Sequence, residues 1–472
     1  MKTVCFRRKE LAAAVGTAVL SLAAGQALGS AFALQEQSGS GLGNAFAGGA
    51  AAAEDASTIF WNPAGMSRFS NIQTVAAGSL ICPSAKFSDS GSQPAALQPL
   101  GGTGGDAGSC AVVPALYLAV PINRQWSFGL GVNAPFGLKT EYDSDWIGRF
   151  QAVKSKVETI NVSPVVSFRV SDMVSIGAGA DWQRIKATLT SRANYGGAFA
   201  LGVQQGVAAG QIPAAAVTPL LAAAAGLESN ADVSGNDSAW GWNIGALIDL
   251  DKQTRIGAQY RSKIKYNVSG SANISNPTFP TLPPTLAPIG AAITNTLNST
   301  VLASGDITLA IEMPDSANIS IFRQIDPKWD VMADVQYTGW SSIQNLTIVR
   351  SSGVVLSTVP ENFRDTWRGS IGANYHYNDQ WMFRGGLAYD QSPVRDAQRT
   401  PRLPDNDRTW LSIGAQYKFS RQIVLDAGYT YIFIKNSSMN QNEGNTAQNG
   451  LISGSYKNNV NILAAQLTYT FN

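Results

Sequence analysis

The chain has 472 residues, of which only 14% are charged, and its net charge is +2. This balance excludes a strongly basic surface for nucleic acid. After residue 30 no stretch reaches the roughly 18 consecutive apolar residues that a membrane helix needs. Few charges, 46 glycines and frequent aromatic residues together favour a transmembrane β-barrel. A secreted β-sandwich or β-helix is the alternative on composition alone.

The first 29 residues have the features of a secretion signal. Basic residues at positions 2–9 precede an apolar run over 11–22, and a small-x-small cleavage site ends at Gly29. An inner-membrane anchor is the alternative, but the apolar run is short and interrupted by glycine. We therefore expect residues 1–29 to be removed from the mature protein.

Small, mostly uncharged residues dominate the segment that follows, residues 30–70. Its sequence is too irregular for one helix or one strand, and it contains an Asn-Pro-Ala-Gly turn at 62–65. A compact, turn-rich segment in front of a membrane barrel has an obvious place inside the lumen. We therefore expect residues 30–70 to form a plug, called the hatch below.

Two cysteines remain once the signal is removed, Cys82 and Cys110. They bracket a Gly- and Ser-rich segment and stand at the outer ends of two predicted strands. In an oxidising compartment such an even pair predicts a disulfide. The disulfide would close the first surface loop and contribute about 3–4 kcal/mol by loop entropy. Two unpaired buried thiols are the alternative.

Residues 71–472 repeat one pattern of strands, joined by tight turns on one side and long loops on the other. Residues 238–270 show it best, because apolar and aromatic side chains alternate there with small or polar ones. Such alternation places one face against lipid and the other in a polar lumen, and Trp and Tyr at strand ends predict interfacial girdles. We expect an all-β fold, a transmembrane antiparallel β-barrel of about 14 strands. The aromatic Phe471 near the end of the last strand resembles the assembly signal of outer-membrane proteins, which makes the barrel assembly machinery an expected partner.

Long loops are expected on the outer surface at residues 84–109, 193–237 and 271–304. Residues 193–227 and 266–305 contain no charged side chain, although surface loops of this class normally carry many. The first of these stretches predicts a short apolar helix after Pro219. Two uncharged, apolar loops on one surface predict a hydrophobic landing site. Flexible low-complexity loops without a role are the alternative.

Several short motifs together resemble a known family. They are Ser38-Gly39-Ser40-Gly41-Leu42-Gly43, Asn62-Pro63-Ala64, Trp240-Gly241-Trp242-Asn243, Leu403-Pro404-Asp405-Asn406-Asp407-Arg408 and Trp410-Leu411-Ser412. With them the chain resembles, over nearly its whole mature length, the long-chain fatty acid transporter family of the bacterial outer membrane, which also includes channels for aromatic hydrocarbons. The resemblance implies a hatch inside a barrel, a groove between two outer loops, a tighter inner site and a lateral opening at a kinked third strand.

That third strand contains Ala134, Pro135, Phe136 and Gly137. Independently of the resemblance, proline cannot donate to a strand ladder and glycine tolerates a bend, so a broken ladder is expected here. A strand end near the following loop is the alternative. A lateral exit makes physical sense, because releasing a chain of about 16 carbons into water costs more than ~10 kcal/mol.

The resemblance gives the hatch residues Asn62, Pro63 and Ala64 a position near this kink. There they would couple movement of the hatch to the lateral opening. A proline turn without such a role is the alternative.

Fatty-acid members of the family place cations where a carboxylate head group can be met. At the matching positions this chain has Leu189 and Val359. Arg192, Arg350 or Arg364 is a candidate substitute after a small shift. Lys263 and Lys265 face the polar side near the outer rim, where contact with solvent or lipid phosphates alone is the alternative. The missing cations favour neutral aromatic or aliphatic hydrocarbons as the alternative to long-chain fatty acids.

Other functional classes fit the sequence poorly. The only histidine, His376, falls near a predicted periplasmic turn, which argues against an enzyme with a histidine base. One histidine and two paired cysteines leave no metal site, and no cofactor is expected. A general porin is the structural rival, but it would carry a charged constriction loop and no hatch. We expect a monomeric, passive channel for hydrophobic small molecules in the bacterial outer membrane, in contact with its lipid and lipopolysaccharide.

Overall fold

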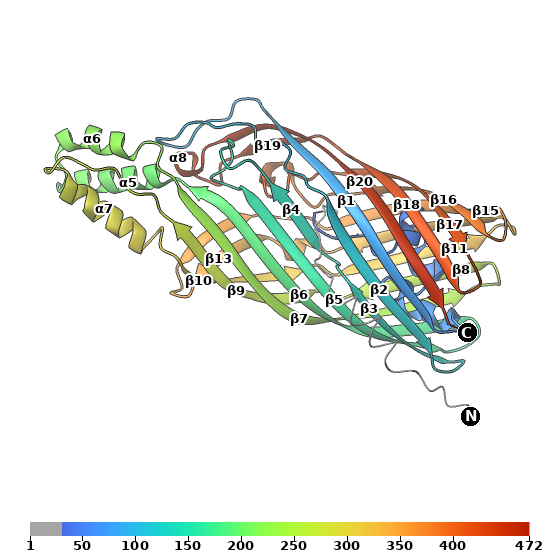
Figure 1. Ribbon diagram of the computed structural model, residues 1–472. Coiled ribbons are helices and arrows are strands. Elements are labelled where there is room, and N and C mark those ends of the chain that lie inside the picture. The colour runs from blue at the N-terminus through green and yellow to red at the C-terminus, as the bar shows by residue number, and fades with distance from the viewer. Residues whose placement is uncertain (1–30, 472) are drawn as a thin grey trace.

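The computed structural model describes residues 31–471, so the expected signal at 1–29 lies outside the described residues. These residues form a closed antiparallel barrel of 14 spanning strands, as predicted. The helices α5, α6 and α7 stand at one end of the barrel, and the C-terminal end of β20 lies at the other (Figure 1). Within this part of the chain no helix has the length and apolar character required to span a bilayer.

The strands are, in chain order, β1 (Gln73–Asp89), β2 (Ala111–Pro121), β3 (Trp126–Asn133), β4 (Gly137–Glu141), β5 (Lys154–Arg169), β6 (Val174–Ala193), β7 (Ser229–Asp249), β8 (Thr254–Arg261), β9 (Ile264–Ser275), β10 (Gly305–Met313), β11 (Ser316–Gln324), β12 (Trp329–Thr338), β13 (Asn345–Arg350), β14 (Val355–Pro360), β15 (Thr366–His376), β16 (Trp381–Asp390), β17 (Arg408–Lys418), β18 (Ile423–Ile434), β19 (Ser437–Gln441) and β20 (Ile452–Thr470). The last strand pairs with the first along its length, from Gln73 opposite Thr470 to Asp89 opposite Gly454. This pairing leaves no open sheet edge, which is the condition for a sheet to span a membrane.

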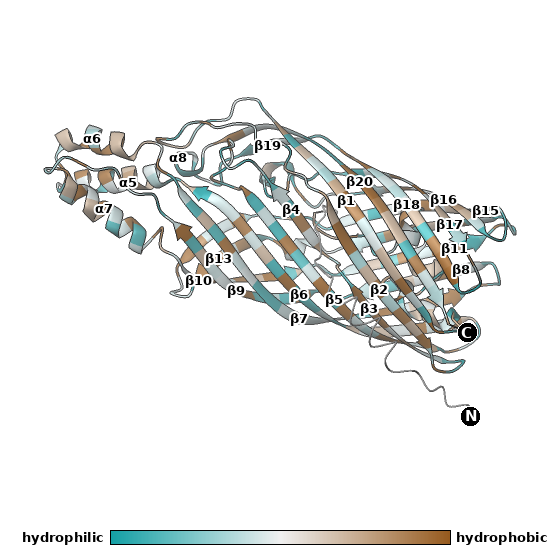
Figure 2. Cartoon of the chain, viewed as in Figure 1, coloured by the Kyte–Doolittle hydropathy of each residue, from teal (hydrophilic) through white to brown (hydrophobic). Residues whose placement is uncertain are grey.

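Each strand has one face toward lipid and one toward the lumen. On β7, Trp240 and Trp242 are 67% and 49% exposed, whereas the inward Asn243 and Leu247 are both 0% exposed. Hydrophobic stretches run along β1, β2 and β3 on the outer wall (Figure 2). The alternation predicted from the sequence is therefore the alternation between lipid and lumen.

Several spanning strands are interrupted. The third one breaks between β3 and β4, which pair in succession with the same neighbour, β5. Similar breaks occur at Ser262 between β8 and β9 and at Pro314 between β10 and β11. A further break, between β12 and β13, contains the short helix η2 (Trp340–Ser342). The sequence analysis found the first break but not the others.

The hatch fills the lumen with short helical turns. They are α2 (Gly39–Leu42), α3 (Gly49–Ala52), α4 (Thr58–Trp61) and η1 (Pro63–Arg68). Its backbone lies so close to the wall that a Cβ atom at Gly257 of β8 would collide with the carbonyl of Ala50. Arginines of the wall donate to hatch carbonyls, for example Arg255 Nη2 to Ala52 at 2.8 Å and Arg384 Nη1 to Ser40 at 2.5 Å. These charge-assisted bonds satisfy backbone groups that form no ladder.

The disulfide predicted between Cys82 and Cys110 is present, with its Cα atoms 4.0 Å apart. It joins β1 to the residue before β2 and closes the first surface loop. Strand β1 itself continues to Asp89, beyond residue 84, where a loop was expected. Its ladder with β20 continues as far as Asp89, and this pairing keeps the segment extended.

The other two long loops are also shorter than expected, because β7 begins at Ser229 and β9 ends at Ser275. Between the strands lie α5 (Tyr195–Ala208), α6 (Ala214–Ala224), α7 (Ala287–Ser299) and, in a later loop, α8 (Thr446–Asn449). The helix predicted to follow Pro219 instead begins at Ala214 and contains the proline. The buried contacts of Ala216 and Leu220 stabilise its first turns.

Candidate ligand-binding site

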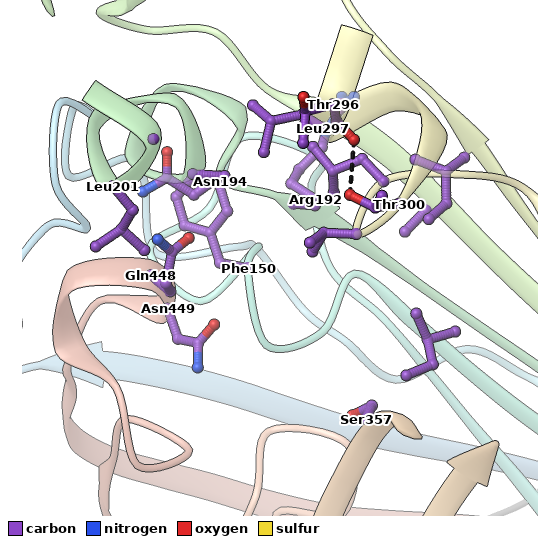
Figure 3. A pocket seen from close by; sticks show the side chains of 18 of the residues that line it. Phe150, Arg192, Asn194, Leu201, Thr296, Leu297, Thr300, Ser357, Gln448 and Asn449 are labelled. Atoms are coloured by element: carbon purple, nitrogen blue, oxygen red, sulfur yellow. Dashed lines mark hydrogen bonds between the residues drawn. The ribbon is translucent and has the colours of Figure 1, made fainter. Parts of the chain in front are cut away.

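A cavity of about 1230 Å³ lies between the loop helices and the outer part of the wall. Leu201 of α5 and Leu297 of α7 lie around it together with Phe150 and Arg192, and Ser357 of β14 lies farther down (Figure 3). Apolar side chains of the wall, such as Ile348 of β13, complete the lining. A large, mostly apolar cavity with a few polar groups is the usual form of a small-molecule site.

The three loop helices form an apolar core of their own. Tyr195, Phe199 and Leu220 are fully buried in it, and the rings of Phe199 and Phe279 stack with centroids 4.6 Å apart. The core joins residues of both uncharged loops. The two loops singled out by their lack of charge therefore come together at the cavity.

The floor of the cavity is polar. Arg402 donates through Nη2 to the Gln151 carbonyl at 2.6 Å and through Nη1 to Ser155 Oγ at 3.1 Å. Glu361 and Glu443 act on Arg402 through space, and no ion pair between them is formed among the described residues. The buried Oε1 atoms of Gln151 and Glu443 have no hydrogen-bond partner among residues 31–471. The floor therefore offers a cation and unused acceptors to a ligand.

Burial also changes the charge of this floor. It raises the pKa of Glu361 to about 8 and raises the pKa of Glu443 above its ordinary value. Near neutral pH the Glu361 carboxyl is therefore mostly protonated, since its pKa exceeds the pH. The protonated form of Glu361 does not offset the positive charge of Arg402.

The sequence-predicted ligand residues divide into two groups. Leu189, Val359 and Arg192 line the cavity. Arg364 and Lys263 do not, because Arg364 Nη2 lies 3.5 Å from Asp407 and Lys263 Nζ lies 3.2 Å from Glu312. Sequence reasoning missed Phe150 and Arg402, which come from loops without a periodic signal.

Below the cavity, four aromatic side chains fill the lumen, namely Phe32, Phe136, Trp340 and Phe363, called the inner aromatic cluster here. The ring of Phe32 meets Trp340 edge-on at 4.7 Å, and Trp340 lies 6.0 Å from Phe363. Strand β6 links the cavity to the cluster, because on its inner face Leu189 lines the cavity and Ile185 packs on the cluster. An apolar surface thus extends from the loops to the middle of the lumen.

The inner aromatic cluster borders the interrupted third strand. Leu34 N donates to the carbonyl of Pro135 at 2.8 Å, Gly137 N donates to that of Phe32 at 2.8 Å, and Gln37 Nε2 donates to that of Ala134 at 2.9 Å. The hatch therefore replaces the missing ladder partners of the kink. These bonds occupy backbone groups that would otherwise be unpaired beside lipid.

The residues expected at the kink lie elsewhere. Asn62 Nδ2 donates to the carbonyls of Ala50 at 2.7 Å and of Ala246 on β7 at 2.8 Å. Pro63 and Ala64 pack against Gly177 of β6. The motif therefore contacts β6 and β7, while hatch residues 32–37 make the backbone bonds to the kink, and its coupling to the lateral opening stays a prediction.

Comparison with known proteins places this geometry in a family. Residues 20–471 match the model described as "Outer membrane protein transport protein (OMPP1/FadL/TodX)". The chain belongs to this family. It is 32% identical over 437 residues to the long-chain fatty acid transport protein of Escherichia coli K12, covering 91% of this chain and 93% of that protein. It is 31% identical over 439 residues to outer membrane protein P1 of Haemophilus influenzae, covering 89% of each.

Solved structures of FadL-family proteins share the fold. A FadL homologue from Pseudomonas aeruginosa superposes with a TM-score of 0.80 and 26% identity, covering 93% of this chain and 100% of that one. The toluene transporter TodX of P. putida gives a TM-score of 0.63 at 18% identity, covering 88% and 94%. This FadL-family member is therefore an outer-membrane transporter of hydrophobic compounds and not an enzyme.

Proposed function

We propose that this transporter takes up long-chain fatty acids by passive diffusion and releases them sideways through the interrupted third strand. The observation that carries the proposal is the apolar surface from the cavity, through the inner aromatic cluster, to the kink at Ala134–Gly137. An acyl chain that follows this surface stays out of water. Each buried methylene retains about 0.8 kcal/mol in this way.

The kink supports a lateral exit because backbone groups of Ala134, Pro135 and Gly137 bond to the hatch, although Phe136 still bonds to Thr159 of β5. Displacement of hatch residues 32–37 would open the wall without breaking a ladder. The Gly137→Arg variant places a long, charged side chain in this opening. We expect it to fold normally and to lose uptake of oleate, whereas uptake at the wild-type rate would contradict the route.

Arg402 supports a carboxylate ligand. The chain lacks cations at Leu189 and Val359, but Arg402 offers a guanidinium on the cavity floor without an ion-pair partner among the described residues. A fatty acid with its tail along Leu201 and Ile348 can direct its head group to this floor. Arginine suits this task, since its planar group binds carboxylates through two parallel hydrogen bonds.

Neutral hydrocarbons are the second candidate, because Leu189 and Val359 make this part of the cavity apolar. Several structural neighbours are channels for monoaromatic hydrocarbons, which agrees with this candidate. Uptake of labelled oleate and toluene in a deletion strain separates the two. We expect toluene to compete weakly, and Arg402→Met to lower oleate uptake about tenfold, as expected for one lost charged hydrogen bond.

The matched control for this substitution is Arg421→Met, which removes an exposed arginine in the turn before β18. Oleate uptake unaffected by Arg402→Met, with efficient toluene uptake, would favour the hydrocarbon candidate. A general porin is tested by liposome swelling with sugars. We expect no swelling, because hatch side chains occupy the lumen.

A further inference from the structure

Outward-facing cations gather on one side of the wall, on β4, β5 and β6. They are Lys139, Lys154, Lys156, Arg184 and Lys186, called the basic patch here. The register shows that they share a face, because Lys139 stands opposite Lys156 and Lys186 stands opposite Glu158. The alternate residues of β5, such as Ser155 and Thr159, are buried toward the lumen.

The basic patch lies directly beyond an aromatic girdle. On the same outward face of β6 and β7, Trp182 stands opposite Trp240. Arg184 and Lys186 follow Trp182 in the direction of the loops. Tryptophan marks the boundary between hydrocarbon and head groups, so the patch lies at the height of the outer-leaflet head groups.

The patch is not neutralised by the protein. Its five cations share this face with two carboxylates, Glu141 and Glu158, which leaves a net charge of +3. Glu141 lies 3.1 Å from both Lys139 and Lys154, and Glu158 lies 3.0 Å from Lys156. Neither Arg184 nor Lys186 forms an ion pair within the described residues. The whole chain, by contrast, has a net charge of only +2.

Within the patch, two cations stand side by side and two have no carboxylate partner among the described residues. Lys139 and Lys156 are direct cross-strand neighbours, and like charges in such positions destabilise a sheet. Glu141 and Glu158 offset part of this repulsion, and an anion placed between the strands would reduce it further. Arg184 Nη2 has only a long contact of 3.5 Å with Asn236 Oδ1, so its remaining donors are available.

We propose that the basic patch binds the phosphate groups of lipopolysaccharide. The protein resides in the outer membrane, whose outer leaflet presents this phosphorylated lipid at the height of the patch. Lysines and arginines near an anionic lipid surface each contribute favourably, and arginine binds phosphate bidentately. The bound lipid would stand beside β4, next to the interrupted strand, whatever compound the channel carries.

The test measures binding of purified, full-length protein in neutral detergent to a defined rough-type lipopolysaccharide, by native mass spectrometry. The patch variant combines Lys156→Gln, Arg184→Gln and Lys186→Gln. The matched control combines Lys252→Gln, Lys328→Gln and Arg421→Gln, which removes three exposed cations from turns at the other end of the barrel. Heat-modifiable mobility on gels verifies that both variants are folded barrels.

We expect the patch variant to lose at least about tenfold in affinity, as three removed cations predict. The control variant should bind as the wild type does. Enzymatic removal of the phosphates from the lipid should reduce wild-type binding to the level of the patch variant. Equal binding by the patch variant and the wild type, equal loss in both variants, or undiminished binding of the dephosphorylated lipid would each overturn the proposal. Phosphatidylglycerol bound as tightly as lipopolysaccharide would also overturn it.

Discussion

Gly137 on the wall donates its backbone N–H to the carbonyl oxygen of Phe32 in the hatch at 2.8 Å. This bond ties the start of β4 to the beginning of the described chain. The same hatch residue contributes its ring to the inner aromatic cluster. One hatch residue therefore contacts both the wall at the kink and the inner aromatic cluster, which is where the proposed route would leave the lumen.

The Phe32→Gly variant removes this ring while it retains the backbone. We expect oleate uptake to rise several-fold at the initial rate, because the lumen beside the kink loses one of the rings that fill it. Phe69→Gly is the control, since Phe69 lies at the other end of the hatch and contacts Met66 and its neighbours. A reduced or unchanged rate in Phe32→Gly would show that Phe32 does not close the path.

Glu36 makes the same hatch segment sensitive to pH. Its carboxyl is buried, and burial raises its pKa from 4.5 to about 7, against the opposing effect of Arg408 and Arg368. The folded state thus holds this proton more tightly than the unfolded chain does. The contribution of this carboxyl to the free energy of unfolding is fully present below pH 4.5. It is lost as the pH rises from 4.5 through about 7, by roughly 3 kcal/mol.

Hydrogen exchange at the amides of Leu34 and Gly137 measures this effect locally. After correction for intrinsic rates, we expect their protection to decrease between pH 5 and pH 8 in the wild type. Glu36→Gln should abolish the decrease, and Glu158→Gln on the outer face should not. Protection that is independent of pH in the wild type would contradict the role of Glu36.

The disulfide carries a separate prediction. Replacing Cys82 and Cys110 by serine frees the first surface loop. By loop entropy, the disulfide contributes about 3.5 kcal/mol to the free energy of unfolding. We expect proteinase K to cleave residues 90–110 faster, while the barrel retains its heat-modifiable mobility. The wild type treated with a reductant should match the double variant. An unchanged cleavage rate would show that packing alone, such as the stacked rings of Tyr142 and Trp146 at 3.9 Å, orders the loop.

The barrel itself was predictable because its signal is periodic. Alternation along residues 238–270, the short turns and Pro135 in the third strand each follow from local rules, and the structure agrees with them. The helices of the uncharged loops were only partly predicted. There Pro219 was interpreted as a start, although buried contacts of Leu220 hold it inside a helix.

The site was harder to predict because tertiary packing assembles it. Nothing local in residues 32–37 indicates that they pair with the kink. From the sequence, Asn62 was an equally good candidate for that contact, but in the structure its side chain donates to β7. Arg402 comes from an irregular segment, and only the closed barrel brings it beneath the loop helices. Pro314 was a readable signal for a further strand interruption that the sequence analysis did not use.

Arg384 of β16 binds the hatch on a part of the wall away from the kink. Its guanidinium donates to the Ser40 carbonyl at 2.5 Å and to Glu54 at 2.9 Å, and it lies 3.1 Å from Asp426. Arg384→Ala leaves two carboxylates without this cation, and removal of one partner of a buried ion pair typically costs 3–5 kcal/mol.

Most of that cost should appear as loosening of the hatch, because β16 retains its ladders with both neighbours. We expect Arg384→Ala to show open-channel conductance in planar bilayers and swelling of liposomes with small sugars, and we expect neither of the wild type. Arg323→Ala, at an exposed position near the end of β11, is the matched control and should remain closed. A variant that stays closed and takes up oleate normally would show that the hatch is held by its close backbone packing rather than by this arginine.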